Sequence, residues 1–534
     1  MKLKKLIAVL SSLCMMMTMY INVTGRNFIL ANADESIESS ETTEDSYSGS
    51  CGENAVWAFD SESGTLTISG TGEMENYLNK TKPWQIYADN ITSLVIEEGI
   101  TTIGSYAFQG FYQLVSVNLP SSLVIINDNA FRSCRALESI IIPKGVEKIQ
   151  EEAFYNCLNL KEINADSENN NFISIDGVLF NNNMTNLIVV PYGKNLEEYT
   201  VPDGVEVISK SAFSYQYSLK SVILPDSLKT IEDNAFWGCN KLKEVIIPDG
   251  TEFIGDYVFV NCSSLEIIDI PQSVSHIGRD TFSGTIFYSN LKSESDDFII
   301  INNMLVGVTS SDSKIVVPSD ITLISVRAFY NLSDLTEVVI PDGCTVCVGA
   351  FYGCSALKSI IFGNNCTLSG DYKDVFDCDA LEELSFGDDC IVCEKVCKNW
   401  SGLKSVILGD NCSVSKNAFG GCEGLKSITA GDNCNFGEDA FSYCLSLEKF
   451  TAGNNCTLGD RVFYGDPFET FKLSEFTVNG NFSFEGNAFY EDFDVRFPDL
   501  SVKYERPALD YKYQDNAGNK LQQFHYRQIN KDMI

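Results

Sequence analysis

The chain has 534 residues, 44% of them hydrophobic, and its 73 acidic against 38 basic side chains give a formal net charge of −35. A surface this acidic repels phosphate backbones and anionic lipids, so the composition argues against binding to nucleic acid or to membrane surfaces. A globular chain of this length would form several domains, but a repeat protein grows without new cores, so length alone does not set the number of domains here.

The first 33 residues have the pattern of an export signal. Three lysines, Lys2, Lys4 and Lys5, precede the apolar run 6–23, and Ala31-Asn32-Ala33 is a small-x-small cleavage site. This pattern predicts a signal peptide, residues 1–33, cleaved after Ala33. Because the apolar run is just long enough to span a bilayer, an uncleaved anchor is the alternative. We therefore expect a secreted or cell-surface protein, with no membrane insertion after signal cleavage.

Two segments of different character follow the signal. Residues 34–50 are rich in Ser, Thr, Glu and Asp and have little to bury, so we expect a disordered linker. Residues 51–92 contain the alternating runs 55–59 and 65–70, joined at Ser63-Gly64, which predict two short strands. A solenoid leaves an open core at its end, and a small β module here would serve as a cap.

From about residue 93 to 490 the chain repeats one unit of 22 to 23 residues. In one copy, Ala130-Phe131 and Cys134 are followed by Leu137, Ile140, Ile142 and Pro143, and Ala153-Phe154 begins the next copy. Self-similarity at this spacing predicts a solenoid in which each turn stacks on the previous one. The landmark phenylalanines of the copies are Phe108, Phe131, Phe154, Phe213, Phe236, Phe259, Phe282, Phe329, Phe351, Phe376, Phe419, Phe441, Phe463 and Phe489.

The alternation within one copy predicts which side chains face the core. Ile140 and Ile142 face inward, Ile141 between them faces outward, and Pro143 ends the strand because it has no N–H to donate. We therefore predict a mainly β fold, a solenoid of about fifteen turns with parallel β ladders, since strands at equivalent positions lie about 4.8 Å apart.

The repeat resembles a known family. The pattern from Leu242, Val245 and Ile247-Pro248 through Ile254 to Phe259 and Cys262 resembles the BspA-like leucine-rich repeats of bacterial surface proteins. The segment around Trp57, Gly70-Thr71-Gly72 and Pro83-Trp84 looks like the module often found before such arrays. The resemblance covers roughly residues 51–490. It implies a secreted or surface-displayed array used in adhesion or protein recognition, and no catalytic residues.

Two insertions and a tail depart from the repeat. The spacing from Phe154 to Phe213 and from Phe282 to Phe329 is too long for one copy, and the extra segments, about 166–200 and 290–320, predict hairpins with polar turns inserted on one edge of the solenoid. Residues 491–534 contain no repeat landmark, and we expect a C-terminal cap or tail there.

Cysteine and histidine were considered as chemical groups. The 19 cysteines fall mainly in two repeat positions, and we expect buried thiols that act as small apolar fillers, with disulfides between neighbouring turns as the alternative in an oxidising compartment. The run Cys390, Cys393 and Cys397 suggests zinc, but two of the three are core positions without a nearby histidine. The two histidines, His276 and His525, are predicted to lie on the surface. We therefore predict no metal, no cofactor and no enzymatic activity. The two cysteine columns are Cys134, Cys157, Cys239, Cys262, Cys354, Cys422 and Cys444, and Cys344, Cys366, Cys390, Cys412, Cys434 and Cys456.

Two outward columns are candidate binding surfaces. The first consists of the outward residue of the first strand in each copy. Stacked turns should place these residues in a continuous stripe, apolar through the middle and polar at the far end, which is typical of a recognition face. Ordinary β-propensity is the alternative explanation for the branched residues at this position. The second follows the landmark phenylalanine and is aromatic, which suits protein or sugar binding, with corner packing as the alternative. We expect a monomer that binds a protein ligand, with a surface glycan as the alternative. The candidate ligand face is Ile141, Ile223, Ile246, Val339, Ile361, Ile407, Thr429 and Thr451, with Asp269 and Ser385 in the same column; the candidate aromatic patch is Tyr155, Trp237, Tyr330, Tyr352 and Tyr464.

Overall fold

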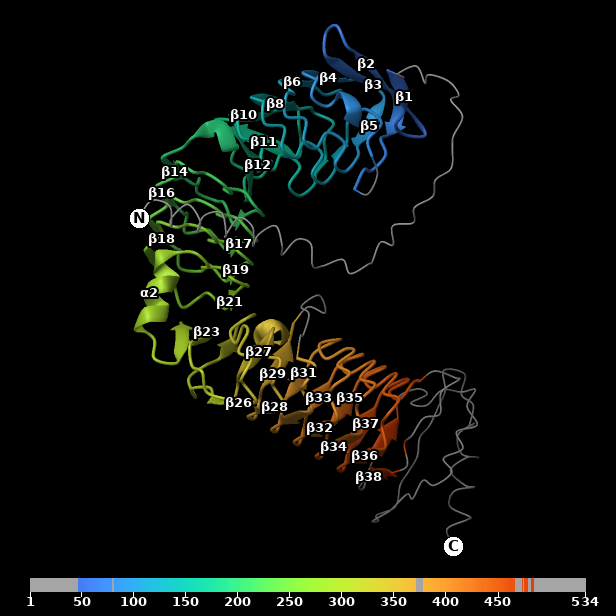
Figure 1. The fold of residues 1–534 in the computed structure, drawn as a ribbon, viewed down its shortest axis with the longest axis vertical. Coiled ribbons are helices and arrows are strands. Elements are labelled where there is room, and N and C mark those ends of the chain that lie inside the picture. The colour runs from blue at the N-terminus through green and yellow to red at the C-terminus, as the bar shows by residue number, and fades with distance from the viewer. Residues whose placement is uncertain are drawn as a thin grey trace, which may run out of the picture. The chain divides into compact units, whose positions relative to one another are not determined.

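The computed structural model describes residues 47–78, 81–370, 378–465, 473, 475–478 and 482–484 (Figure 1). The predicted signal peptide, linker residues 34–46, the landmarks Phe376 and Phe489, His525 and the predicted C-terminal cap or tail lie outside the described residues.

The described chain is a β-solenoid of about 16 turns, which confirms the predicted fold class. Each regular turn contributes one strand to a first ladder and one to a second ladder, and strands of successive turns pair in parallel. In-register pairs such as Ile126 with Ile149 and Ile231 with Ile254 place equivalent repeat positions directly over one another.

The first ladder is formed by three successive groups of strands. They are β4 (Ser93–Ile96), β6 (Ser116–Asn118), β8 (Ser139–Ile142) and β10 (Glu162–Ala165); β14 (Glu198–Thr200), β16 (Ser221–Ile223), β18 (Glu244–Ile246) and β20 (Ile267–Asp269); and β24 (Lys314–Val316), β26 (Glu337–Ile340), β28 (Ser359–Phe362), β30 (Glu383–Phe386), β32 (Ser405–Leu408), β34 (Ser427–Ala430), β36 (Lys449–Ala452) and β38 (Glu475–Val478).

The second ladder has shorter strands and the same division. Its strands are β5 (Ile100–Ile103), β7 (Ile125–Ile126) and β9 (Lys148–Ile149); β11 (Phe172–Ile175), β12 (Val178–Asn181), β13 (Asn186–Val189), β15 (Val207–Ile208), β17 (Thr230–Ile231), β19 (Phe253–Ile254) and β21 (His276–Ile277); and β22 (Phe298–Ile301), β23 (Met304–Val308), β25 (Leu323–Ile324), β27 (Thr345–Cys347), β29 (Thr367–Ser369), β31 (Ile391–Val392), β33 (Ser413–Val414), β35 (Asn435–Phe436), β37 (Cys456–Leu458) and β39 (Phe482–Phe484). Short 3-10 helices are η1 (Gln85–Tyr87), η2 (Tyr192–Lys194) and η3 (Val348–Phe351).

The N-terminal module is the predicted β hairpin, β2 (Asn54–Asp60) with β3 (Thr65–Glu73), paired antiparallel around Gly64. Strand β3 then pairs in parallel with both β4 and β5, so both ladders begin at this strand. The buried Trp84 of this module stacks on Phe108 with ring centroids 5.7 Å apart, which closes the first turn of the core.

The predicted linker boundary is wrong at its C-terminal end. Residues Ser48–Ser50 form a strand, β1, that pairs antiparallel with Val56–Ala58 of β2. Tyr47 stacks on Tyr87 with centroids 5.3 Å apart. The strand forms because the edge of β2 offers backbone partners to a segment that has no strand signal of its own.

Both insertions form the predicted hairpins, but they do not hang on an edge of the solenoid. β11 and β12 turn at Asp176-Gly177, β22 and β23 turn at Asn302-Asn303, and all four turn residues have positive φ, as a two-residue hairpin requires. Each hairpin is the start of a new second-ladder sheet, in the orders β11-β12-β13 and β22-β23-β25. A helix that we did not predict, α2 (Ile286–Glu294), follows Thr285, whose hydroxyl accepts the N–H of Tyr288.

The two hairpins divide the solenoid into three blocks. We call the turns from β3 to β10 block 1, those from β11 to β21 block 2, and those from β22 to β39 block 3. Three clusters of buried side chains match this division, each filled largely by the inward residues of its own strands.

The landmark phenylalanines form the spine of each block, as predicted. Phe131 and Phe154 stack at 5.7 Å, Phe236 and Phe259 at 5.4 Å, and Phe329 and Phe351 at 5.0 Å between ring centroids. Offset stacking at this separation is a favourable arrangement of aromatic rings. The prediction that one turn lies over the next is therefore confirmed for these residues.

Candidate interaction surface

The outward column of block 3 is a single uninterrupted row. Its members occupy the third position of eight first-ladder strands, and each lies beside the next in the parallel register, which spans roughly 34 Å at the usual strand spacing of about 4.8 Å. The column runs through Val316, Val339, Ile361, Ser385, Ile407, Thr429, Thr451 and Thr477.

The predicted stripe is not continuous over the whole chain. Ile141 lies in the two-stranded sheet of β8 and β10, and Ile223 and Ile246 lie in the four-stranded sheet from β14 to β20. The first hairpin lies in the chain between β10 and β14, and α2 with the second hairpin lies between β20 and β24, at the two places where the first ladder starts a new sheet. The column positions are nevertheless open to solvent: 63% of Ile141, 63% of Ile223 and 59% of Ile246 are exposed.

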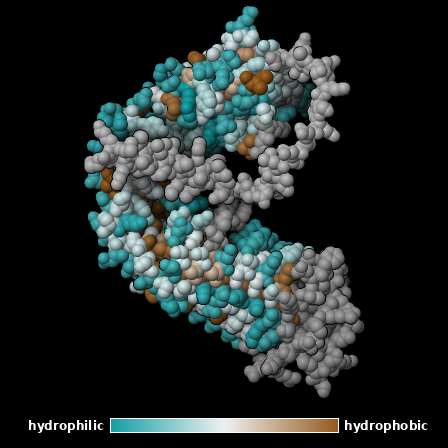
Figure 2. All heavy atoms as spheres, in the orientation of Figure 1, coloured by the Kyte–Doolittle hydropathy of each residue, from teal (hydrophilic) through white to brown (hydrophobic). Residues whose placement is uncertain are grey.

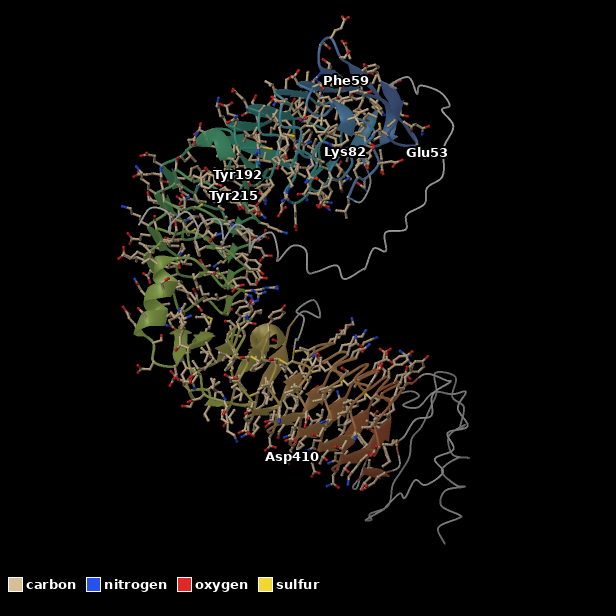
Figure 3. The ribbon with its side chains drawn as sticks, in the orientation of Figure 1. Glu53, Phe59, Lys82, Tyr192, Tyr215 and Asp410 are labelled. Carbon is tan, nitrogen blue, oxygen red and sulfur yellow. The ribbon has the colours of Figure 1, made fainter. Side chains whose placement is uncertain are left out.

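An acidic ladder borders the outward column of block 3 where the strands end. The side-chain oxygen of Asp388 accepts the backbone N–H of Asp410 at 2.8 Å, and that of Asp410 accepts the N–H of Asp432 at 2.7 Å. Asp342, Asn364 and Asp432 make the same contact to the next turn. Asp410 is labelled in Figure 3. One side chain thus links each turn to the next while the carboxylates remain at the surface.

Lysines lie at the start of several strands of the same face. Lys404 pairs with Glu382 at 2.5 Å, Lys449 with Glu475 at 3.0 Å, and Lys314 with Glu337 at 3.3 Å. These partners lie on neighbouring turns and are well exposed, so each pair contributes little to stability. Figure 2 shows that the visible surface of the described residues is largely hydrophilic, with hydrophobic side chains in small separate groups.

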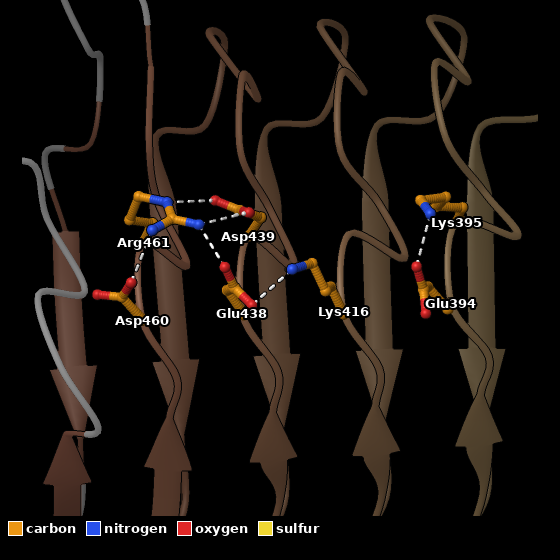
Figure 4. Close-up of polar contacts among 7 residues, drawn as sticks. All are labelled: Glu394, Lys395, Lys416, Glu438, Asp439, Asp460 and Arg461. Carbon is orange, nitrogen blue, oxygen red and sulfur yellow. Dashed lines mark hydrogen bonds and ion pairs between the residues drawn. The ribbon is translucent and has the colours of Figure 1, made fainter.

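A further ionic network lies at a corner of the last described turns (Figure 4). The guanidinium of Arg461 donates to both carboxylate oxygens of Asp439 at 3.1 Å and to Asp460 at 2.8 Å, and it also pairs with Glu438. Glu438 in turn accepts from Lys416 at 2.6 Å, and this contact is the main cause that lowers the pKa of Glu438. Each charge has at least one opposite partner on the same or a neighbouring turn, so the network stabilises these turns.

The residues of the candidate aromatic patch lie at the corners of the turns and form separate pairs rather than one continuous surface. Tyr330 and Tyr352 stack with centroids 5.9 Å apart, and the guanidinium of Arg327 lies over both rings. Trp237 contacts Tyr257, and Tyr464 contacts Tyr443.

Tyr155 belongs to a separate cluster. Its hydroxyl lies 3.0 Å from that of Tyr215, and its ring contacts Tyr192 and the guanidinium of Arg132. Tyr192 and Tyr215 are labelled in Figure 3. Corner packing therefore accounts for most of the aromatic patch.

The first cysteine column is buried as predicted, and it has a hydrogen-bonding role that the sequence did not reveal. Each thiol of this column donates to a backbone carbonyl of the previous turn, for example Cys157 to Phe131, Cys239 to Phe213 and Cys262 to Phe236, all at 3.1 Å. Where glutamine replaces cysteine, the Gln216 amide donates in the same way to Val190. Burial raises the pKa of the Cys422 thiol to about 12 and that of Cys444 well above its ordinary value, so these groups stay protonated donors.

Thiols of the second cysteine column also donate hydrogen bonds to backbone carbonyls of an earlier turn. Cys390 donates to the carbonyl of Gly363 and Cys412 to that of Gly387, both at 3.2 Å. The described cysteines are free thiols, and only Cys393 among them is partly accessible. Among the described residues, no group of three or more His, Cys, Asp or Glu side chains is arranged to hold a metal ion. Cys390, Cys393 and Cys397 are thus not brought together as a zinc site.

His276 is half-buried rather than freely exposed. Its ring stacks on Phe253 with centroids 4.5 Å apart, and burial lowers its pKa against the attraction of Asp256 and Asp233. No acid or base partner for catalysis accompanies it in these contacts.

Parallel ladders, a stacked aromatic spine and an outward residue in every first strand define a leucine-rich-repeat solenoid. The model of the BspA type leucine rich repeat region matches residues 86–193, 190–310, 299–419 and 391–496. The chain belongs to this BspA-type leucine-rich repeat family. No curated protein sequence gives a significant match.

Solved structures with similar folds include several bacterial repeat proteins. A leucine-rich repeat protein from Eubacterium ventriosum is 21% identical, with 74% of this chain and 94% of that chain covered and a TM-score of 0.33. One from Bacteroides ovatus is 21% identical, with coverage of 85% and 99% and a TM-score of 0.26. A leucine rich cell surface protein from Faecalibacterium prausnitzii is 20% identical, with coverage of 82% and 94% and a TM-score of 0.24. In the part of this chain that the structure describes, no helix is long and apolar enough to cross a bilayer.

Proposed function

We propose that this protein is a secreted or cell-surface, non-enzymatic repeat protein that binds a protein ligand through the outward face of its first ladder, in adhesion or in host or cell–cell contact. The observation that carries this proposal is the uninterrupted outward column of block 3, in which Val316, Ile361, Ile407 and Thr429 are exposed on a chain with a net charge of −35.

The apolar members of the row are Val316, Val339, Ile361 and Ile407, and Ser385 lies between the last two. The two isoleucines of the column, Ile361 and Ile407, are 38% and 40% exposed. The aspartate ladder borders the column on one side and the lysine–glutamate pairs border it on the other. Apolar residues inside a polar rim are the usual anatomy of a protein interface. β-Propensity explains why branched residues stand in the strands, and the parallel register then places them in a row. Their exposure between charged borders is therefore what supports a binding face.

The test is affinity capture of partners from the producing cell or its host. Ile223, Ile246 and Ile361 are changed together to Lys, and Phe253 and Ile391, which are exposed on the second ladder, are changed to Lys as the control. We expect the first variant to lose capture by roughly tenfold or more, because interface centres contribute a large share of binding energy, and the control to retain it. Equal capture by both variants would exclude the first-ladder face.

A carbohydrate-binding or wall-associated structural role is the second candidate. It is supported by Tyr330, which is 42% exposed and stacked on Tyr352. Binding to insoluble polysaccharide that disappears on changing Trp237 and Tyr352 to Ala would favour this role over protein binding. Surface display itself is supported by the export signal at residues 1–33 and is tested by labelling intact cells with an impermeant reagent.

A further inference from the structure

Block 1 contains a break in the first ladder that opens its core. Strand β6 pairs only with β4, and β8 pairs only with β10, so no ladder joins β6 to β8. On the second ladder of the same turns, β7 and β9 remain paired. The strands β6 and β8 remain neighbours, but backbone ladder hydrogen bonds join these turns on the second-ladder side only.

The parting exposes side chains that belong to the core. Val117 occupies the inward position, beside Leu94 of β4, and Leu119 follows two residues later. Both are half-buried, whereas Leu94, Ile96, Ile140 and Ile142 at the equivalent positions are at most 2% exposed. Apolar surface that the turns of β4 and β8 bury is thus partly accessible from outside.

A pocket of about 580 Å³ occupies this opening. Its apolar part is formed by Val117, Leu119, Pro143 and the outward-column residue Ile141. The other lining residues are polar or charged, so the pocket has a small apolar part inside a mostly polar wall. An anchoring side chain seated in such a pocket can dominate an interface.

The rim of the pocket is acidic. Glu98, Asp166 and Glu168 line it, and the one cation in the lining, Lys144, already pairs with Glu168 at 2.8 Å. Glu98 accepts from the backbone N–H and the hydroxyl of Ser121, and these hydrogen bonds lower its pKa, so it is anionic at neutral pH. The remaining charge of the rim favours a cationic occupant.

The charge also decides between the possible occupants. Residues 34–46 of this chain contain six carboxylates and no Lys or Arg, and a second copy of the chain carries the same net charge of −35. Both are repelled by an acidic rim. A segment of another protein with a bulky apolar side chain between basic residues is complementary to the pocket in shape and charge.

Resting on the proposed function, we infer that the opening between β6 and β8 is the anchor site of the binding face, and that it takes a bulky apolar side chain flanked by Lys or Arg on an extended partner segment. This assigns the partner chemistry of the face as cationic and apolar, and it places the anchor in block 1.

The experiment uses three labelled peptides and fluorescence polarisation at physiological salt. The peptides are Arg-Trp-Arg, Glu-Trp-Glu and Arg-Ser-Arg, each with blocked ends, and the protein is the full secreted chain. The key variant is Ile141→Ser, and the control is Ile86→Ser, since Ile141 is 63% and Ile86 72% exposed and Ile86 lies outside both the pocket and the candidate ligand face. Asp166→Asn tests the rim, because an amide oxygen can still accept the N–H of Glu168 as Asp166 does.

We expect saturable binding of Arg-Trp-Arg only, a loss of about tenfold in affinity for Ile141→Ser, less than about twofold for Ile86→Ser, and about two- to fivefold for Asp166→Asn. Binding of Arg-Ser-Arg or Glu-Trp-Glu as tight as that of Arg-Trp-Arg overturns the inference, and so does an equal effect of the two serine variants. These peptides do not involve the native partner, so a failure here leaves the affinity-capture result on the proposed function standing.

Discussion

Replacing Cys239 tests whether the thiol columns act as hydrogen-bond donors. The thiol is fully buried and donates to the carbonyl of Phe213 at 3.1 Å. The same carbonyl also accepts the N–H of Gln216 at 3.2 Å, so it keeps one partner when the thiol is removed. We therefore expect the modest cost of one lost hydrogen bond, about 1 kcal/mol, rather than the larger cost of an orphaned carbonyl.

The change Cys239→Ala adds the loss of buried sulfur surface and a small cavity, worth about 1 kcal/mol more. We expect Cys239→Ala to lower the free energy of unfolding by about 2 kcal/mol and Cys239→Ser, which keeps a donor, to lower it by about 1 kcal/mol. The measurement is urea unfolding followed by circular dichroism, with a thiol reductant present. Cys393→Ala is the control, because Cys393 is partly accessible. A serine variant less stable than the alanine variant would refute the donor role.

Three further outcomes are expected. Iodoacetamide at pH 8 should modify Cys393 first among the described cysteines, because Cys393 is partly accessible and the others are buried. Mass spectrometry of timed samples measures this, and early labelling of the buried Cys344 would contradict it. Burial places the pKa of His276 below its ordinary value of 6.5, so the unfolded chain binds more protons at this residue and stability should fall as the pH drops below 6.5. In urea unfolding at pH 5 to 7, His276→Gln should reduce this dependence of stability on pH. An unchanged dependence would show that other groups cause it. Asp410→Ala should lower the free energy of unfolding by about 1 kcal/mol because the N–H of Asp432 loses its acceptor. Asp410→Asn should be as stable as the wild type, because Asn364 already makes the same contact to Asp388 with an amide oxygen. Equal losses of stability in the two variants would show that the charge, and not the hydrogen bond, matters.

The repeat could be predicted from the sequence because each copy carries the same information. The spacing of Phe131, Phe154 and their equivalents sets the length of a turn, and the alternation of Ile140, Ile141 and Ile142 sets which side chain faces out. The structure buries Ile140 and Ile142 and exposes Ile141. Local pattern and global fold agree here, which is why the prediction succeeds.

The features that escaped prediction depend on contacts between turns. Strand β1 forms only because β2 offers it an edge. The hairpins were visible in the sequence, but their role in starting new sheets was not, since a strand pattern does not state its neighbour. Helix α2 had a signal, Thr285 as an N-cap, within a segment that we read as part of a hairpin insertion.

The candidate site was predictable in part for the same reason. The outward positions follow from alternation, whereas the continuity of the column does not, because it depends on where the ladder breaks. The opening between β6 and β8 left no mark in the repeat pattern: Val117 and Leu119 occupy ordinary core positions, and only the missing pairing exposes them. The donor role of the cysteines likewise needed the position of a carbonyl on the previous turn.

The most direct measurement of the central claim is hydroxyl-radical footprinting of the protein with its captured partner. If the first-ladder face binds, labelling of Ile223, Ile246 and Ile361 should drop in the complex, while Phe253 and Ile391 on the second ladder are labelled as in the free protein. Protection of Phe253 and Ile391 with unchanged labelling of the three isoleucines would show that the partner binds elsewhere.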